Sequence, residues 1–135
     1  MIRSHWSVRS GWLLSGLVIA FLLLDGGMKL VPLEMVVTTT AALGYPPSPV
    51  LIRGLGVLAL ACTALYAYPR TAVLGAILLT AYMGGAIASH LRLGSPLFSH
   101  ILFGGYLGVL AWGGLYLRDA RLRALLPWRT LATDP

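Results

Sequence analysis

The chain has 135 residues, of which 58% are hydrophobic and only 10% are charged, whereas an average soluble domain is about a quarter charged. This composition excludes an ordinary soluble globular protein, and a mean hydropathy of +0.83 predicts that the protein is embedded in lipid. The formal net charge of +6 favours anionic lipid headgroups over nucleic acid as a partner, because four C-terminal cations adjoin an apolar segment: Arg118, Arg121, Arg123 and Arg129.

The first apolar segment follows a basic N-terminus and covers residues 11–31. It is long enough to cross a hydrocarbon core of about 30 Å. Because no small-residue cleavage site follows it, the pattern predicts a retained membrane anchor rather than a removed signal peptide. Asp25 and Lys29 lie in its last third, four residues apart, so they share one helix face and can pair directly.

The loop after this segment, residues 32–49, carries helix start and stop signals. Pro32 and Glu34 are typical of a helix start, and Gly44 before a proline pair is typical of a helix end. The pattern predicts a short helix over residues 33–43, which is too short to span a bilayer. We therefore expect an interfacial or re-entrant lid across the outer mouth of the protein.

Three further apolar segments follow, over residues 50–68, 71–91 and 97–117. Pro69 between the first two predicts a tight turn, and the basic residues 118–135 predict an interfacial tail. We expect an all-α fold, an integral membrane four-helix bundle in which residues 1–135 form a single transmembrane domain. Small residues in the last two spans predict closely packed helix faces: Gly84, Gly85, Ala88, Ser89, Gly104 and Gly108.

The distribution of cations predicts the orientation of the bundle. Arg92 is the one cation in a loop on one side, whereas seven lie outside the spans on the other: Arg3, Arg9, Arg70, Arg118, Arg121, Arg123 and Arg129. Because cytoplasmic segments are enriched in Arg and Lys, both termini are expected in the cytoplasm. The loop with Arg92 and the predicted lid then lie at the outer end.

Ionisable residues of all four spans lie toward this outer end. Charges inside a bilayer are costly and normally pair or line a cavity, so their convergence predicts a functional site. The expected catalytic groups are Asp25 and His90. The expected ligand contacts from the spans are Lys29, Arg53, Tyr82, Arg92 and His100.

Each of these residues also has a structural interpretation. Lys29, Arg53 and Arg92 can extend to lipid headgroups, Asp25 can serve only to pair with a cation, and the histidines can bond helix ends. The functional alternatives for the histidines are a proton relay, a quinone contact or axial haem ligation. The sequence contains no metal-ligand spacing such as H-x-x-x-H, and no phosphate loop, nucleophile elbow or dinucleotide fingerprint.

Four motifs, with a further stretch from Trp112 to Asp119, extend over nearly the whole chain: Asp25-Gly-Gly-Met-Lys29-Leu30, Leu43-Gly44-Tyr45-Pro46, the stretch from Tyr68 to Gly75, and the stretch from Gly84 to Arg92. In order and spacing they resemble the DoxX-like family of small bacterial membrane proteins. The resemblance implies a four-helix bundle in the inner membrane of a bacterium. It also adds Tyr45 to the expected ligand contacts, among the residues that match the family pattern: Asp25, Lys29, Tyr45, Pro46, Arg53, His90 and Arg92.

Relatives in the broader DoxX and DoxD group imply an association with thiosulfate:quinone oxidoreductase and with oxidative-stress complexes. The first hypothesis is therefore an accessory protein of membrane redox metabolism that binds a quinone or another lipophilic small molecule. Cys62 is the only cysteine, which excludes a thiol pair within the chain. Redox activity then requires a cofactor or a partner protein.

Three other functions stay open. An acid/base isomerase or hydrolase acting on a lipophilic small molecule would use Asp25 or His90 as its base. A small-molecule transporter driven by protons is disfavoured, because Lys29 competes with a proton for Asp25. A scaffold for partner helices needs no ligand. The glycine faces are compatible with a monomeric bundle and with a homodimer.

Overall fold

The computed structural model describes residues 5–31 and 33–129. These residues form helices and no strand: α1 (His5–Leu30), α2 (Glu34–Ala42), α3 (Pro49–Ala67), α4 (Ala72–Arg92), the π-helical turn η1 (Leu97–Ile101), α5 (Phe103–Arg118) and α6 (Ala120–Leu125). Four segments are long and apolar enough to cross a membrane, namely α1, α3, α4 and Leu97–Arg118. The predicted all-α four-helix membrane bundle is confirmed. The cation Arg3 and the helix-start signal Pro32 lie outside the described residues.

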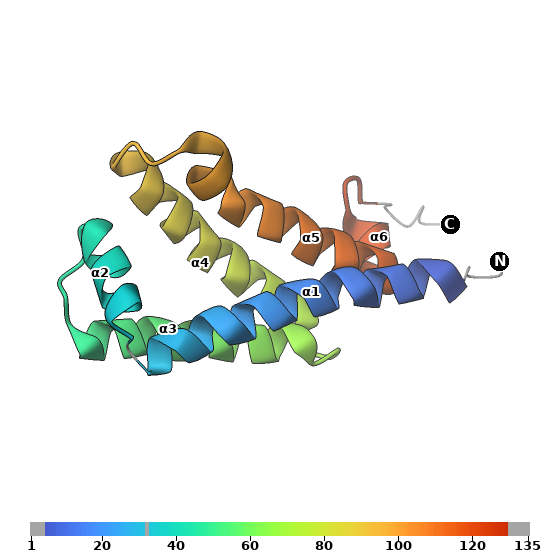
Figure 1. The fold of residues 1–135 in the computed structure, drawn as a ribbon. Helices are drawn as coiled ribbons and strands as arrows, with labels where there is room; N and C mark the ends of the chain where they lie inside the picture. Colours follow the sequence, from blue (N-terminus) through green and yellow to red (C-terminus); the bar gives the residue numbers. More distant parts are fainter. Residues whose placement is uncertain (1–4, 32, 130–135) are drawn as a thin grey trace, which may run out of the picture.

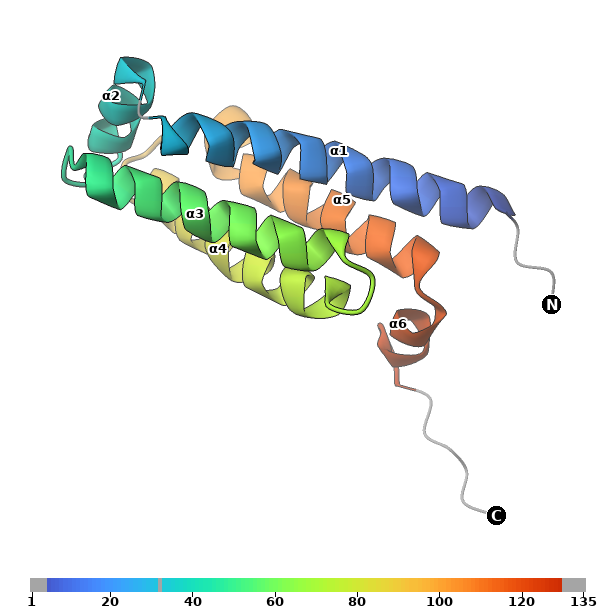
Figure 2. The same ribbon diagram turned by 90° about the horizontal axis from the view of Figure 1, so that it is seen from below.

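The four long helices follow one another around the bundle in the order α1, α3, α4 and α5. Both α1 and α4 pack against α3 and α5, so α1 and α4 lie on a diagonal. The start of α1, helix α6 and the turn between α3 and α4 lie at one end of the bundle, which we call the terminal end (Figures 1 and 2). At the opposite end, here called the α2 end, α4 leans away from α1 and α3 (Figure 1).

Glycines allow the helices to touch at the terminal end. A Cβ atom on Gly11 of α1 would lie 2.7 Å from the carbonyl oxygen of Gly114 on α5. A Cβ atom on Gly75 of α4 would overlap the backbone nitrogen of Tyr66 on α3. Because backbone atoms cannot move aside as a flexible side chain can, these contacts at the terminal end require glycine.

The close packing predicted for the glycines of the last two spans is mostly wrong. A Cβ atom on Gly104 would lie 2.9 Å from Ile87, as close packing requires. Nothing lies within 4 Å of the same position on Gly84, Gly85 or Gly108. The rotation of α4 and α5 turns these three glycines to the outer surface or toward a cavity rather than toward a neighbouring helix.

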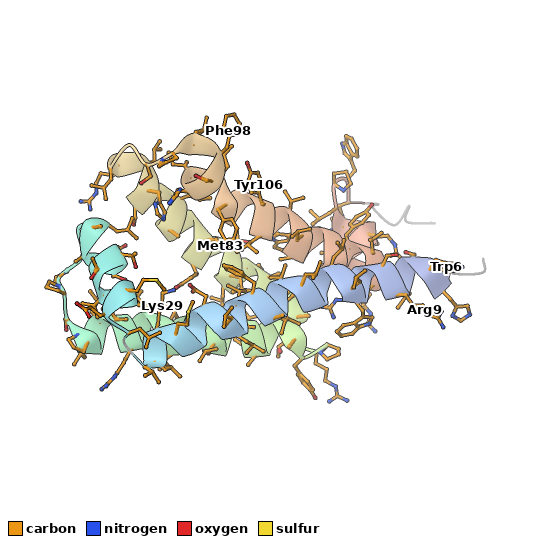
Figure 3. The ribbon with its side chains drawn as sticks, in the orientation of Figure 1. Trp6, Arg9, Lys29, Met83, Phe98 and Tyr106 are labelled. Atoms are coloured by element: carbon orange, nitrogen blue, oxygen red, sulfur yellow. The ribbon has the colours of Figure 1, made fainter. Side chains whose placement is uncertain are left out.

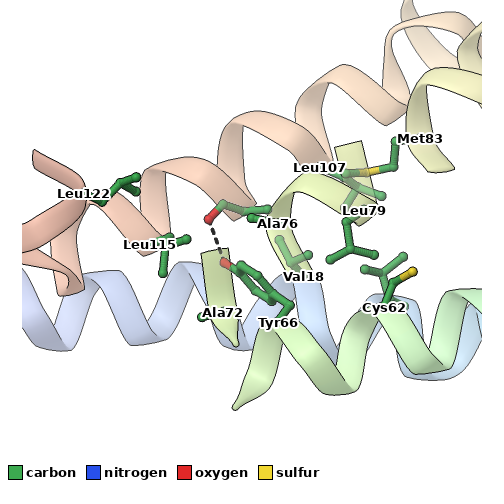
Figure 4. Close-up of a cluster of buried hydrophobic side chains, with 12 residues drawn as sticks. Val18, Cys62, Tyr66, Ala72, Ala76, Leu79, Met83, Leu107, Leu115 and Leu122 are labelled. Atoms are coloured by element: carbon green, nitrogen blue, oxygen red, sulfur yellow. Dashed lines mark hydrogen bonds between the residues drawn. The ribbon is translucent and has the colours of Figure 1, made fainter. Parts of the chain in front are cut away.

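The core is a single cluster of buried side chains drawn from all four long helices and from α6 (Figure 4). Tyr66 is fully buried at its centre. The Tyr66 hydroxyl donates a 2.6 Å hydrogen bond to the carbonyl oxygen of Ala111 and lies 2.9 Å from Oγ of Ser15. These bonds offset the cost of burying a hydroxyl in a core surrounded by lipid.

Two cations of the basic tail are engaged within the chain. Arg118 donates a hydrogen bond of 3.1 Å to Oγ of Ser15, and its guanidinium carbon lies 4.1 Å from the centre of the Trp12 ring. Arg123 donates two 2.8 Å bonds to backbone carbonyl oxygens at the end of α5. The tail cations left exposed for lipid headgroups are Arg121 and Arg129.

The fourth span is interrupted near its start by η1. The backbone N–H of Ile101 donates to the carbonyl oxygen of Pro96, and that of Leu102 donates to Leu97, so both bonds span five residues. Such π-helical turns change the rotation of the chain and often occur at functional sites. Here the turn places His100 beside His90 of α4, which the apolar pattern of the sequence does not predict.

Candidate ligand cavity at the α2 end

A cavity of about 890 Å³ lies between the helices at the α2 end. Its volume falls within the roughly 300–1,000 Å³ that small-molecule sites occupy. Side chains from α1, α2, α4 and α5 line it, and Lys29 and Met83 mark its two sides in Figure 3. Most of the wall is apolar, with its larger side chains supplied by Phe21, Met28, Met35, Met83, Phe103 and Leu107.

An ion pair on α1 forms part of the wall. Nζ of Lys29 is in direct contact with Oδ2 of Asp25, which confirms the pairing predicted from their spacing. The side chains are only 16% and 28% exposed, respectively. A pair this deep adds little net stability, because the cost of removing both charges from water offsets their attraction. The ion pair is therefore of interest for its position on the cavity wall rather than for its contribution to stability.

Two histidines form a second polar group, on the wall made by α4 and η1. The ring centres of His90 and His100 are 5.5 Å apart, and the rings meet edge to face. Nδ1 of His90 lies 3.1 Å from Oγ of Ser95, and Nδ1 of His100 lies 2.7 Å from Oγ of Ser99. The serine hydroxyls thus fix both rings through one nitrogen and leave the Nε2 atoms for a ligand.

The α2 helix covers the mouth of the cavity, and two side chains tie the segment that directly follows it to α4. The Tyr45 hydroxyl lies 2.9 Å from Oγ of Ser89. Nη2 of Arg92 donates a 3.0 Å hydrogen bond to the carbonyl oxygen of Leu43. Gly44 permits this approach because its φ is +85° and a Cβ atom there would lie 2.6 Å from Nη2 of Arg92. The predicted short helix therefore has the position of a lid.

Not all expected site residues reach the cavity. Those that line it are Asp25, Lys29, Tyr45, Tyr82, His90 and His100. Arg92 is outside the lining and holds the lid instead. Arg53 is exposed on α3 and is also outside the lining, because its neighbour Ile52 occupies the buried face of the helix and the next residue points about 100° further round.

Several contributors to the site were not predicted from the sequence. Ser99 directly precedes His100, which is a weak signal, but Ser95 bonds His90 only because the chain turns back between α4 and η1. The rings of Phe21 and Phe103 meet edge to face with centres 5.1 Å apart, joining α1 to α5 at the cavity wall. Such contacts between separate segments cannot be predicted from a local sequence pattern.

Fold and cavity together define a small multi-pass membrane protein with a ligand-sized space at one end of a helical bundle. The model of the DoxX-like family matches residues 13–114, so the chain belongs to the DoxX-like family. Every residue that lines the cavity lies within this matched range. Comparisons with curated proteins and with solved structures gave no match.

Proposed function

We propose that this DoxX-like protein binds a quinone or a related lipophilic small molecule in the cavity, as an accessory of membrane redox metabolism. The observation that carries the proposal is the arrangement of the polar groups. Asp25 and Lys29 come from α1, and His90 comes from α4 on the diagonal of the bundle, with apolar walls between them. Two polar groups therefore face each other across an apolar space.

A quinone suits such a space because it is a flat apolar ring with a carbonyl oxygen at each end. Nζ of Lys29 can donate a hydrogen bond to one carbonyl oxygen, and an imidazole N–H of His90 or His100 can donate to the other. Reduction of a quinone also consumes protons, which the histidines can deliver. The electrons must come from a cofactor or a partner protein, because Cys62 is the only cysteine.

A second candidate function is favoured by the way His90 is held. A histidine whose Nδ1 is fixed by a hydroxyl presents Nε2 in a defined direction, as a general acid or base requires. The same cavity would then support isomerisation or hydrolysis of a lipophilic substrate without any redox partner. Turnover by the purified protein alone distinguishes this function from an accessory role.

The location proposed for the protein is the inner membrane of a bacterium, with both termini in the cytoplasm. The exposed cations at the terminal end support this orientation, because cytoplasmic segments are enriched in Arg. They are Arg9, Arg70, Arg121 and Arg129. In this orientation the cavity and its lid belong to the outer half of the membrane.

The binding proposal is tested by mass spectrometry of an organic-solvent extract of the protein purified in mild detergent. We expect a quinone or another lipophile at about one molecule per chain. Gly85 and Gly84 provide a matched pair of variants, since both are exposed with open space around them but only Gly85 lines the cavity. Gly85→Trp should remove the ligand, and Gly84→Trp should retain it.

A third variant, Asp25→Asn, tests the polar side of the same site. It keeps the size of the side chain and removes the charge that pairs with Lys29, so retention of the ligand should fall. Phospholipid alone, in equal amounts in the wild type and all variants, would contradict the proposal.

A further inference from the structure

Lys29 is the only lysine in the chain, and its place is unusual for a residue that serves only as a charge. Its side chain is 16% exposed, it lines the cavity, and its side-chain partner is Asp25. No other ion pair is found in the part of the chain that the structure describes. An arginine at this position could pair with the Asp25 carboxylate through more hydrogen bonds. As a partner for Asp25, a lysine therefore has no structural advantage over an arginine.

A primary amine in an apolar cavity has a chemistry that a guanidinium lacks. A lysine surrounded by apolar groups can act as a nucleophile toward carbonyl carbon, provided that the ammonium first loses a proton. The Asp25 carboxylate is in contact with Nζ and can take that proton. Filling the cavity with an apolar molecule excludes water, which lowers the cost of the neutral pair relative to the two charges.

We propose that Lys29 captures lipophilic aldehydes as a reversible imine inside the cavity, with Asp25 as proton acceptor and counterion. This inference deepens the proposed function and rests on it, since it assigns a reaction to the same cavity. The class of ligand follows from the walls: Phe21, Met83 and Phe103 suit an alkyl or aromatic body, and the carbonyl group must reach Nζ.

The reaction balances without an oxidant or a reductant. Asp25 takes one proton from the Lys29 ammonium, and the neutral Nζ forms a bond to the carbonyl carbon as the π bond to oxygen breaks. A proton moves from nitrogen to that oxygen and gives a carbinolamine. Asp25 then returns its proton to the hydroxyl group, one water leaves, and a protonated imine remains paired with the Asp25 carboxylate. Addition of water reverses every step.

The test uses the full chain in detergent, dodecanal as the probe and sodium cyanoborohydride to trap the imine. Intact mass spectrometry should show one alkyl group per chain, and peptide mapping should place it on Lys29 rather than on the N-terminal amine. Lys29→Arg keeps the charge and should lose the adduct. Gly85→Trp should slow its formation by about tenfold or more, because the cavity no longer holds the aldehyde beside Nζ, whereas Gly84→Trp should leave the rate unchanged.

Two results would overturn the inference: no trapped alkyl group on Lys29 of the wild-type chain, or equal labelling rates in the two glycine variants. Peptide mapping of the wild type decides the first point even if Lys29→Arg fails to fold. Retention of an extractable quinone by a chain that forms no adduct would refute only the imine. An adduct on Lys29 without any retained quinone would support the imine and refute quinone binding.

Discussion

Arg92 donates a hydrogen bond of 3.0 Å to the backbone carbonyl oxygen of Leu43 and so connects the end of α4 to the end of α2. The two residues are 49 positions apart in the chain. The partner of Arg92 is a carbonyl oxygen that helix α2 leaves without a bond of its own, and the interaction therefore caps the lid while it fastens it. Arg92, which was expected among the ligand contacts, lies outside the cavity lining and bonds the end of the lid instead.

The first prediction concerns this fastening. Arg92→Met should loosen α2, and hydrogen–deuterium exchange of its backbone amides should become faster. One hydrogen bond from an exposed side chain contributes at most about 1 kcal/mol, which corresponds to an increase of up to roughly fivefold in local opening. Arg53→Met is the matched control, because Arg53 is also an exposed cation near the α2 end but makes no hydrogen bond to the described residues of the lid. Equal exchange in both variants would refute the fastening role.

The second prediction concerns the contact between α4 and α3. Gly75→Ala should destabilise the bundle by about 3 kcal/mol or more, since the new Cβ atom overlaps the backbone of Tyr66. Thermal unfolding in detergent should show a clear decrease in Tm. Gly16→Ala on α1 is the control: nothing lies within 4 Å of a Cβ there, and the better helix propensity of alanine should give a small gain of up to about 1 kcal/mol. Similar Tm values for the two variants would contradict the close contact.

The third prediction concerns the cation at the terminal end. Arg118→Lys should lower stability by about 2 kcal/mol, because a lysine cannot keep both the bond to Ser15 and the flat stacking on Trp12. Thermal unfolding measures the change. Arg121→Lys, at an exposed position of α6, should leave Tm nearly unchanged. If both substitutions have the same small effect, Arg118 serves only as a surface charge.

The sequence was sufficient for the architecture and for part of the site. Long apolar segments and the Pro69 turn determine the number of helices, because the thickness of a bilayer sets the length of a spanning helix. The pairing of Asp25 with Lys29 was equally accessible, since it depends only on the regular geometry of a single helix. Local rules of this kind need no knowledge of how the helices pack.

The wrong predictions for residues within the helices have one cause: a sequence does not show how each helix is rotated about its axis. The apolar residues of α3 surround the helix, so hydropathy does not reveal that Arg53 lies outside the cavity lining. The same ambiguity made Gly84 and Gly85 appear to be packing positions. His100 was expected at the site and lines the cavity, but its contact with His90 depends on the π-helical turn η1, and no residue in that turn identifies it in advance.

The contact between Gly75 and Tyr66 gives the pair α3 and α4 a fixed vertex. Helices α3 and α4 separate progressively with distance from this contact. The length of α4 therefore determines the width of the opening that α2 must close. One additional helical turn would carry the tip of α4 about 5.4 Å further along its axis, with its lining face kept in nearly the same direction. The size of the cavity in such a protein can therefore be adjusted by whole turns of one helix, without altering any residue of the cavity wall.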